Sequence, residues 1–440
     1  MSKPTAKMPR GFAPVPRTGV IFVMDAAAAA GFRAGDPDWV NLGQGAPETG
    51  RLPGSPERLT SIPVAVASSE YAPVPGLTDL RQAVATLYNE RFRKGKSSQY
   101  GPENVAISAG GRTGLTRIAA ALDRVHLGHF LPDYTAYEEL LEQFRGFIPI
   151  PILAKKRCLP SPEELRKEIV GRGLGALLLS NPCNPTGDVI TGEALSQWLA
   201  ASRELSCPMI FDEFYSHYIY DAGWPEGDAN SAARYVEDVN ADPILIVDGL
   251  TKNWRYPGLR VSWTLGPASV IEAIASAGSF LDGGAPHPVQ QAAVPLVSLD
   301  HAVAEARSIQ VEFIKKRDVM VRRIREMGFL LDRDPRGGFY CFPSLENLRP
   351  ELRDGDAFFR ACLEKKVITV PGHFFDVNPG QRRSHLPSRM RNYVRLSFGP
   401  SMAEITLGLD RLAELCSAGQ VELRYLRSGP AGRSFARPAK

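Results

Sequence analysis

The sequence lacks the features that mark nucleic-acid-binding and membrane-spanning proteins. Its net charge is only +4 over 440 residues, and no dense basic stripe is interleaved with aromatic residues. We therefore expect no nucleic acid partner, because phosphate binding depends on clustered positive charge. No stretch approaches the roughly 20 apolar residues that a membrane-spanning helix requires, so we expect no membrane partner either.

Cysteine and histidine are also sparse. The six cysteines lie far apart and form no Cys-x-x-Cys pair, which favours free thiols in a reducing compartment. The seven histidines show no His-Glu-x-x-His or related spacing, so we expect no catalytic metal. Asp25 interrupts the alanine-rich segment 20–32, which we interpret as a helix packed on the body of the protein and not as a signal sequence. A cytoplasmic protein is the expectation.

The remaining composition is that of a large soluble protein, with 44% hydrophobic and 23% charged residues. A chain of this length predicts one large and one smaller domain. We expect four parts. An N-terminal arm that joins the small domain covers residues 1–55, and a large cofactor-binding domain covers 56–294. A small C-terminal domain covers 295–420, and a flexible tail covers 421–440.

Continuous apolar runs alternate with amphipathic stretches through the middle of the chain. The runs 176–179, 209–211 and 244–247 have no polar alternation, which is typical of strands buried on both faces. Amphipathic helices are predicted between them, at 162–170 and 192–203. This pattern predicts an α/β fold with a mostly parallel central sheet between helices.

The C-terminal third has a different pattern, which predicts a smaller α+β domain. A long charged helix is predicted over 301–327, followed by strands at 337–342, 367–370 and 393–397 and by a closing helix at 403–417. Residues 1–16 and the segment from 428 are rich in Pro, Arg, Gly or Ser, and we expect a mobile arm and a disordered tail.

Lys252 carries the strongest chemical signal in the sequence. It ends an apolar strand, follows the hydroxyl residue Thr251 and precedes Arg260 by eight positions. A lone lysine usually lies on the surface, but two upstream motifs change this interpretation. They are Asn-Pro-Cys-Asn-Pro-Thr-Gly at 181–187 and Asp-Glu-Phe-Tyr at 212–215. Together they predict a pocket for an aldehyde cofactor, pyridoxal 5'-phosphate (PLP), whose imine a lysine amine would form.

The two motifs offer the polar groups that the cofactor ring needs. Asp212 follows a buried strand, and its carboxylate could hold a protonated pyridine nitrogen, although a turn or cap residue is the alternative. Asn184 and Tyr215 are candidate donors to the ring oxygen. A plain strand-to-helix turn would also explain Asn184, since Asn, Pro and Gly favour turns.

Further candidates come from other loops. Gly110, Gly111 and Arg112 lie between a strand and a helix, where free amides could hold a phosphate, although a bare turn has the same pattern. Tyr134 could stack on the pyridine face or belong to the core. Arg395 on a mostly apolar strand could bind a substrate carboxylate through its guanidinium fork, or form a structural ion pair.

In this combination and order, the motifs resemble the class I/II aminotransferases of the fold-type I PLP-dependent enzymes, from about residue 41 to about 416. The resemblance implies that Lys252 forms the internal aldimine and shuttles the substrate proton, and that Asp212 binds the pyridine nitrogen. It implies ring-oxygen contacts from Asn184 and Tyr215. It also implies a phosphate-binding role for Arg260, a carboxylate-binding role for Arg395 and a substrate-loop position for Gly45. Asn184 is expected to contact the substrate as well as the cofactor.

The segment 70–81 resembles the one whose tyrosine, here Tyr71, reaches the phosphate in the neighbouring subunit. The resemblance therefore implies a homodimer with shared active sites. Two positions depart from the family. Gly249 replaces a phosphate-binding serine, so that Thr251 could supply the hydroxyl instead, and Arg112 stands where small or hydroxyl residues are common.

The expected function is transfer of an amino group between an α-amino acid and a 2-oxo acid. The same scaffold also hosts elimination, replacement and C–C bond formation, and a specialised biosynthetic reaction of that kind is the alternative. A DNA-binding regulator is not expected, because the residues before Asn41 contain no helix-turn-helix pattern. The sequence leaves the identity of the amino acid open.

Overall fold

The computed structural model describes residues 9–12, 19–142, 150–153 and 159–427. Most of the predicted arm at 1–16, and the predicted tail from 428, lie outside these residues. None of the helices in the described ranges is long and apolar enough to cross a membrane.

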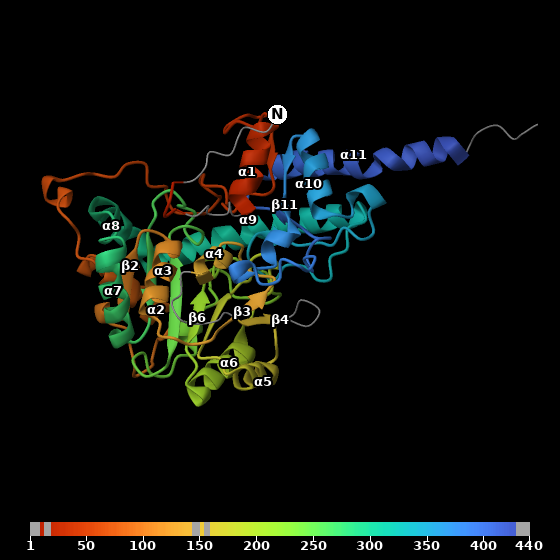
Figure 1. Cartoon of the computed structure of the whole chain (residues 1–440). Coiled ribbons are helices and arrows are strands. Elements are labelled where there is room, and N and C mark those ends of the chain that lie inside the picture. Colours follow the sequence, from red (N-terminus) through yellow and green to blue (C-terminus); the bar gives the residue numbers. More distant parts are fainter. Residues whose placement is uncertain (1–8, 13–18, 143–149, 154–158, 428–440) are drawn as a thin grey trace, which may run out of the picture.

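A mostly parallel sheet forms the centre of the fold (Figure 1). In the described chain its order is β2-β8-β7-β6-β5-β3-β4, and only β8 runs against its neighbours. The predicted α/β class is confirmed. The strands are β2 (Val105–Ser108), β3 (Leu127–Leu131), β4 (Ile150–Leu153), β5 (Ala176–Ser180), β6 (Met209–Asp212), β7 (Ile244–Gly249) and β8 (Ser262–Leu265).

Side chains alternate along these strands and feed two separate layers of core. In β5, Leu178 packs in the same cluster as Leu115 of α3 and Ile271 of α7, while Leu177 packs with Trp198 of α6. Because both faces are covered by helices, the strands read as unbroken apolar runs in the sequence. The covering helices are α3 (Gly111–Ala121), α4 (Tyr137–Glu142) and α7 (Ala268–Leu281) on one face, and α2 (Thr78–Phe92), α5 (Pro162–Arg172) and α6 (Gly192–Leu205) on the other.

Local sequence signals set several helix ends. Ser161 caps α5 by accepting a hydrogen bond from the Glu164 amide, and the Glu164 side chain bonds back to the Ser161 amide. Gly173 then ends the helix in a left-handed conformation with φ 60°. This capping box followed by a C-terminal glycine explains the predicted helix boundaries.

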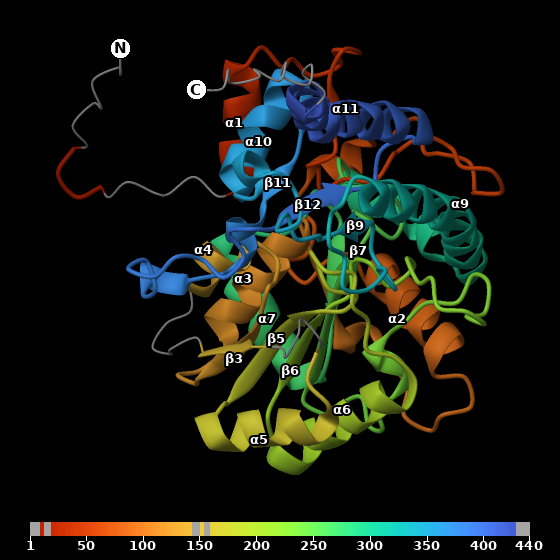
Figure 2. The ribbon, with the colours of Figure 1, turned by 90° about the vertical axis from the view of Figure 1, so that its right-hand side faces the viewer.

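Smaller sheets and helices lie at the other end of the molecule from α5 and α6 (Figures 1 and 2). β12 lies between β11 and β9 in an antiparallel sheet, and β1 pairs with β10 in parallel. The elements are β1 (Val40–Asn41), β9 (Tyr340–Cys341), β10 (Val367–Ile368), β11 (Val370–Pro371), β12 (Val394–Ser397), α1 (Gly19–Ala29), α9 (Leu299–Glu326), α10 (Gly355–Glu364) and α11 (Met402–Arg427). Helix α8 (His287–Ala293) lies instead beside α2 at the large sheet.

Some strands differ from their predicted extent. The predicted strand 367–370 is two strands, because β10 pairs with β1 whereas β11 pairs with β12. Only Tyr340–Cys341 of the predicted strand 337–342 forms β9. The domain boundaries stay a proposal. The pairing of β1 with β10, which ties the N-terminal segment to the C-terminal part, and the start of α9 at Leu299 support them.

Candidate active site

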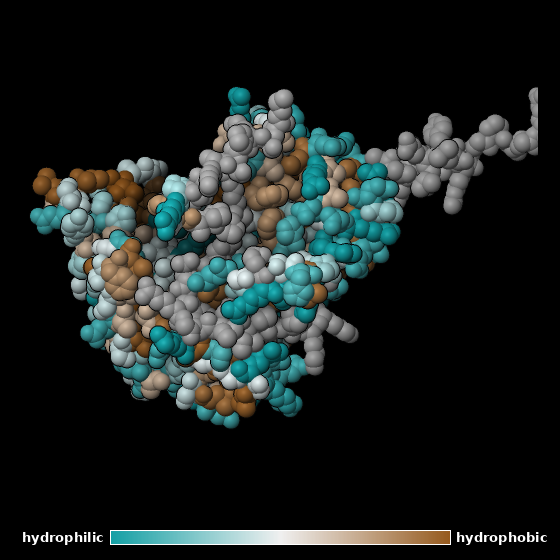
Figure 3. Space-filling view, viewed as in Figure 1, coloured by the Kyte–Doolittle hydropathy of each residue, from teal (hydrophilic) through white to brown (hydrophobic). Residues whose placement is uncertain are grey.

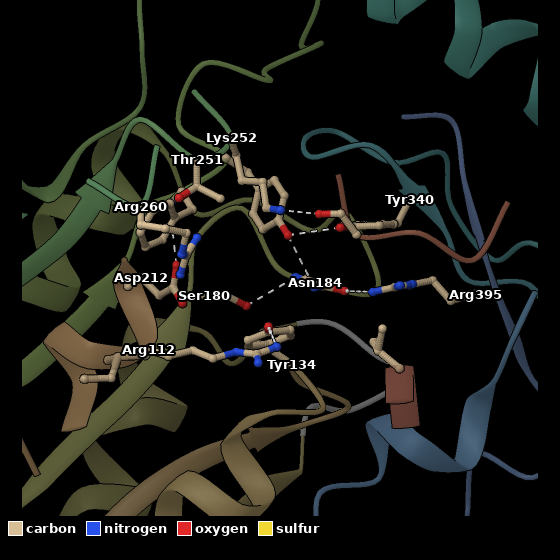
Figure 4. Close-up of a pocket in the computed structure, with 16 residues that line it drawn as sticks. Arg112, Tyr134, Ser180, Asn184, Asp212, Thr251, Lys252, Arg260, Tyr340 and Arg395 are labelled. Carbon is tan, nitrogen blue, oxygen red and sulfur yellow. Dashed lines mark hydrogen bonds between the residues drawn. The ribbon is translucent and has the colours of Figure 1, made fainter. Parts of the chain in front are cut away.

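Loops from one edge of the central sheet surround a cavity of about 470 Å³. The strands β2, β3, β5, β6 and β7 all end at this edge, which is where ligands bind in open α/β sheets. Figure 4 shows side chains from these loops facing one another and facing Arg395 from β12. Of the predicted residues, the cavity is lined by Gly45, Gly111, Arg112, Tyr134, Asn184, Asp212, Tyr215, Thr251, Lys252, Arg260 and Arg395.

Lys252 lies in the loop after β7, and its amine donates a hydrogen bond to the carbonyl of Gly45. The backbone carbonyl of Lys252 accepts a hydrogen bond from Tyr218 Oη at 2.9 Å, which fixes the loop. Burial, followed by the positive charges of Arg395 and other arginines, lowers the pKa of Lys252 to about 7. A neutral, nucleophilic amine is therefore well populated near neutral pH.

Asp212 is the last residue of β6 and lies buried at the base of the cavity. Tyr137 Oη donates to its Oδ2 at 2.8 Å, and the Phe214 amide donates to its Oδ1 at 3.4 Å. Burial raises the pKa of Asp212 to about 6, against these hydrogen bonds and the charge of Lys252. A cation placed against this carboxylate would stabilise its ionised form, and a protonated pyridine nitrogen is such a group.

Asn184 links Tyr215 to Arg395 across the cavity through one hydrogen bond to each. Asn184 Nδ2 donates to Tyr215 Oη at 3.4 Å, and Asn184 Oδ1 accepts from Arg395 Nη1 at 3.1 Å. Arg395 also donates from Nη2 to the Gly43 carbonyl at 2.7 Å. Its Nε is buried without a partner in the described residues, so a guanidinium donor is available to an entering anion.

The loop after β2 and the loop after β7 form a cradle for an anion. Gly110 has φ 92°, and a Cβ there would overlap the Arg260 guanidinium. A Cβ at Gly111 would overlap the Phe214 ring. The close approach of these groups to the first turn of α3 therefore requires both glycines. Gly111, the first residue of α3, lines the cavity, so the N-terminus of this helix lies at the cavity wall.

Thr251 Oγ1 is buried beside this cradle and has no hydrogen-bond partner in the described part of the chain. Arg112 Nη2 donates to Tyr134 Oη at 2.9 Å. Two guanidinium groups, an unpaired hydroxyl and a helix N-terminus suit a phosphate dianion. The cradle, the carboxylate and the amine thus fit the three ends of PLP.

Tyr71 does not lie in this cavity. Its side chain is 98% exposed, and it lines a separate depression with Glu70, Gly283 and His287. Within a single chain it therefore lies apart from the predicted site residues that line the cavity.

Five lining residues were missed in the sequence, and they are Val20, Leu115, Ser180, Phe214 and Tyr340. Tyr340 lies in a segment that was predicted only as a strand. No period or spacing indicated which of its aromatic residues faces the site. Ser180 ends an apolar strand directly before the 181–187 motif, and that position was a signal that could have been used.

A lysine of lowered pKa, a buried carboxylate and an anion cradle thus surround one cavity. These features define the class of protein, which is an enzyme. Comparison with known proteins gives the family. The model for aminotransferase class I and II matches residues 37–412. The chain therefore belongs to the class I and II aminotransferases, as the sequence motifs predicted, and it is an aminotransferase.

Similar proteins agree in name and in fold. The aspartate aminotransferase of Streptomyces avermitilis is 28% identical over 409 residues, covering 88% of this chain and 89% of the relative. The aspartate/prephenate aminotransferase of Thermus thermophilus is 27% identical over 361 residues, covering 80% and 84%. A solved aminotransferase from Mycobacterium tuberculosis has the same fold, with a TM-score of 0.75, 23% identity and coverage of 94% and 100%.

Proposed function

We propose that the cofactor of this aminotransferase is PLP and that Lys252 holds its aldehyde through the side-chain amine. When bound, PLP withdraws electrons from the substrate carbon that bears the amino group. The observation that carries the proposal is the convergence of Lys252, Asp212, Asn184 and the anion cradle on one cavity.

Each end of the cofactor has a proposed partner. Asp212 would hold the pyridine nitrogen, and Asn184 with Tyr215 would donate to the ring oxygen. The phosphate would take the amide of Gly111 at the start of α3 together with Thr251, Arg112 and Arg260. Gly110 would contribute by its lack of a side chain, because its amide already donates to the Ser108 carbonyl at 2.9 Å. Tyr134 would stack on the ring. The orphaned Thr251 hydroxyl and the overlap that any side chain at Gly110 would cause support this placement.

The proposed substrates are an α-amino acid and a 2-oxo acid. Arg395 would bind the carboxylate next to the reacting carbon, with Asn184 fixing the guanidinium and Gly45 forming the facing wall. Lys252 is the amine placed to take the proton from that carbon and to return it, and its pKa of about 7 suits both directions.

An acidic side chain is the proposed substrate class. Arg112 lines the cavity and donates to Tyr134. Its guanidinium would bind the side-chain carboxylate of the substrate in addition to the cofactor phosphate. The names of the relatives from Streptomyces avermitilis and Thermus thermophilus, both of which include aspartate, support the same class.

We also propose a homodimer in which Tyr71 reaches the cofactor phosphate of the neighbouring subunit. The side chains around it support an interface, since Val64 is 68% and Val66 is 91% exposed in a single chain. Figure 3 shows hydrophobic atoms gathered on the projection that carries η1 (Val66–Ser69). A cytoplasmic location stays a prediction of the sequence.

The test is a single-turnover titration of the PLP-loaded protein with amino acids, read by absorbance. Aspartate or glutamate should convert the visible band of the bound cofactor to the near-ultraviolet band of its amine form, and a 2-oxo acid should reverse the change. Release of a leaving group with no amine form would instead indicate elimination or replacement. Lys252→Ala should give no conversion.

A further inference from the structure

Tyr340 is a buried polar residue of the cavity that no motif predicted. It lies on β9, and its side chain is only 1% exposed. Its ring packs against the Arg395 guanidinium, with the Arg395 Cζ 4.3 Å from the ring centroid. Its hydroxyl lies 3.1 Å from the hydroxyl of Tyr215 (Figure 4).

The hydrogens of this hydroxyl pair can be counted. A tyrosine hydroxyl has one hydrogen to donate and lone pairs to accept. The Tyr215 oxygen already accepts from Asn184 Nδ2 at 3.4 Å. If Tyr215 donates its single hydrogen to a cofactor ring oxygen, its bond to Tyr340 requires the hydrogen of Tyr340. Among the described residues, Tyr340 Oη has no hydrogen-bond partner other than Tyr215.

We propose that Tyr340 is a positioning residue that donates to Tyr215 and thereby makes Tyr215 a stronger donor to the cofactor ring oxygen. The inference rests on the proposed function and extends it by one residue. Hydrogen bonds in a chain polarise one another, so the bond from Tyr340 increases the positive character of the Tyr215 hydrogen. Burial raises the pKa of Tyr340 to about 12, which keeps this hydrogen in place over the working pH range.

The consequence can be read in the titration of the cofactor linkage. A stronger hydrogen bond from Tyr215 stabilises negative charge on the ring oxygen. The ring oxygen then attracts less strongly the proton that it shares with the nitrogen supplied by Lys252. That nitrogen therefore loses its proton at a lower pH. Removing the Tyr340 hydroxyl should raise the pH midpoint. The expected rise is about 0.4 pH unit, which corresponds to half the strength of one neutral hydrogen bond.

Other charged and titratable groups face the same nitrogen from the surrounding elements. They are Asp212 from β6, Arg112 from α3, Arg260 from the loop after β7, Arg395 from β12, and the phenols of Tyr134 and Tyr215. Tyr137 lies behind Asp212 and donates to its carboxylate. Tyr340→Phe changes none of them and keeps the ring under Arg395. A shift in that variant therefore reports the hydroxyl and not the packing of the ring.

The matched control is Tyr220→Phe. Tyr220 is also buried, and its hydroxyl donates to the Gly338 carbonyl at 2.6 Å, two residues before Tyr340. It is outside the cavity lining, so its removal tests for any general effect of losing a buried hydroxyl near β9. Tyr340→Leu provides the opposite contrast, because it also removes the ring that packs on Arg395, and it should raise the KM for the amino donor.

The experiment is a pH titration of the visible absorbance of each variant loaded with PLP, including Tyr215→Phe and the Tyr215→Phe/Tyr340→Phe double variant. We expect an upward midpoint shift for Tyr340→Phe, a larger one for Tyr215→Phe, and no shift in the double variant beyond that of Tyr215→Phe. Tyr220→Phe should titrate like the wild type. The PLP dissociation constant of Tyr340→Phe should rise by no more than a few-fold.

Two results would overturn the inference while leaving the cofactor assignment intact. They are a wild-type midpoint in Tyr340→Phe, and additive shifts in the double variant, which would show that Tyr340 does not act through Tyr215. A wild-type chain that takes up no PLP would contradict the proposed cofactor, and the inference would fall with it. The appearance of the visible band in the wild type separates the two kinds of failure.

Discussion

At the scale of single residues, Gly249 and Thr251 determine which hydroxyl group lies beside the anion cradle. A Cβ at Gly249 would lie 2.5 Å from the Val261 carbonyl oxygen and 2.6 Å from Ser262 Cα, both of them backbone atoms. The serine that is often found here in the family therefore has no room. Thr251 Oγ1 is buried and unpaired in the described chain, and this makes it the hydroxyl available to a phosphate.

The first prediction follows from this geometry. Thr251→Val should weaken PLP binding about ten-fold, the cost of one hydrogen bond to a charged group, with little change in the stability of the cofactor-free protein. Thr251→Ser should bind PLP like the wild type. Fluorescence titration with PLP measures both. Gly249→Ser should lower the melting temperature without improving binding, and a tighter complex would refute this account of the site.

A second prediction concerns the buried amine. The pKa of Lys252 is about 7 in the folded chain, whereas an unfolded lysine titrates near about 10.4. Between these values the unfolded chain binds the extra proton, so stability rises with pH across this window. The cost of burying the charged amine is fully present below about pH 7 and is lost towards pH 10.

Cofactor-free Lys252→Met should therefore be more stable than the cofactor-free wild type at pH 6, and the difference should shrink as the pH rises to about 10. Urea unfolding at a series of pH values measures this difference. Lys167→Met is the control, since Lys167 lies exposed on α5 beside Glu163. A Lys252 difference that stays constant with pH would contradict the lowered pKa.

Site residues were predictable where a short sequence motif contains the functional residue. Asn184, Asp212 and Lys252 each lie in a short motif at the end of an apolar strand, and the sheet brings these strand ends together. Tyr340 was not predictable, because its place in the cavity depends on how β9 pairs with β12. That pairing joins residues more than fifty positions apart, such as Cys341 and Leu396, and leaves no local pattern.

At the scale of elements, a buried ion pair holds the lysine loop against α9 and the N-terminal segment. Arg255 Nε donates to Glu305 Oε1 at 2.6 Å, and both side chains are fully buried. Arg255 also donates to the carbonyls of Glu48 and Gly50. The left-handed backbone of Arg255, with φ 55°, is tolerated because these contacts hold it in place.

Breaking this pair should destabilise the fold. Among the described residues, Arg255→Met would leave the Glu305 carboxylate with Arg58 alone, at 3.4 Å. We expect a loss of about 3–5 kcal/mol in the free energy of unfolding. The double variant Arg255→Met/Glu305→Leu should lose less than the sum of the two single variants. Urea unfolding of the four proteins completes the cycle, and additive losses would show that the pair is not coupled.

Strands were predicted well where helices cover both faces of the sheet, and less well in the short strands of the smaller sheets. Unbroken apolar runs mark β5, β6 and β7 because helices cover both faces of the sheet. The short strands of the smaller sheets carry no such signal. Residues 367–370 form one run of β-branched residues, yet backbone pairing divides them between β1 and β12. A sequence pattern does not specify the pairing partners.

At the scale of the whole molecule, exposed apolar side chains predict the assembly. Val64→Glu should shift the proposed homodimer towards monomer and weaken PLP binding, because Tyr71 of the neighbouring subunit would no longer reach the phosphate. Val170→Glu on α5 is the matched control, since both valines are 68% exposed in a single chain. Sedimentation velocity measures the assembly, and a monomeric wild type would contradict the shared site.

The most direct measurement traps the bond between cofactor and protein. The PLP-loaded protein is reduced with borohydride, digested and mapped by mass spectrometry, with Lys252→Ala treated in parallel. We predict a single stable pyridoxyl label on the peptide that contains Lys252, and none in the variant. A label on another lysine of the wild type, or no label at all, would contradict the account.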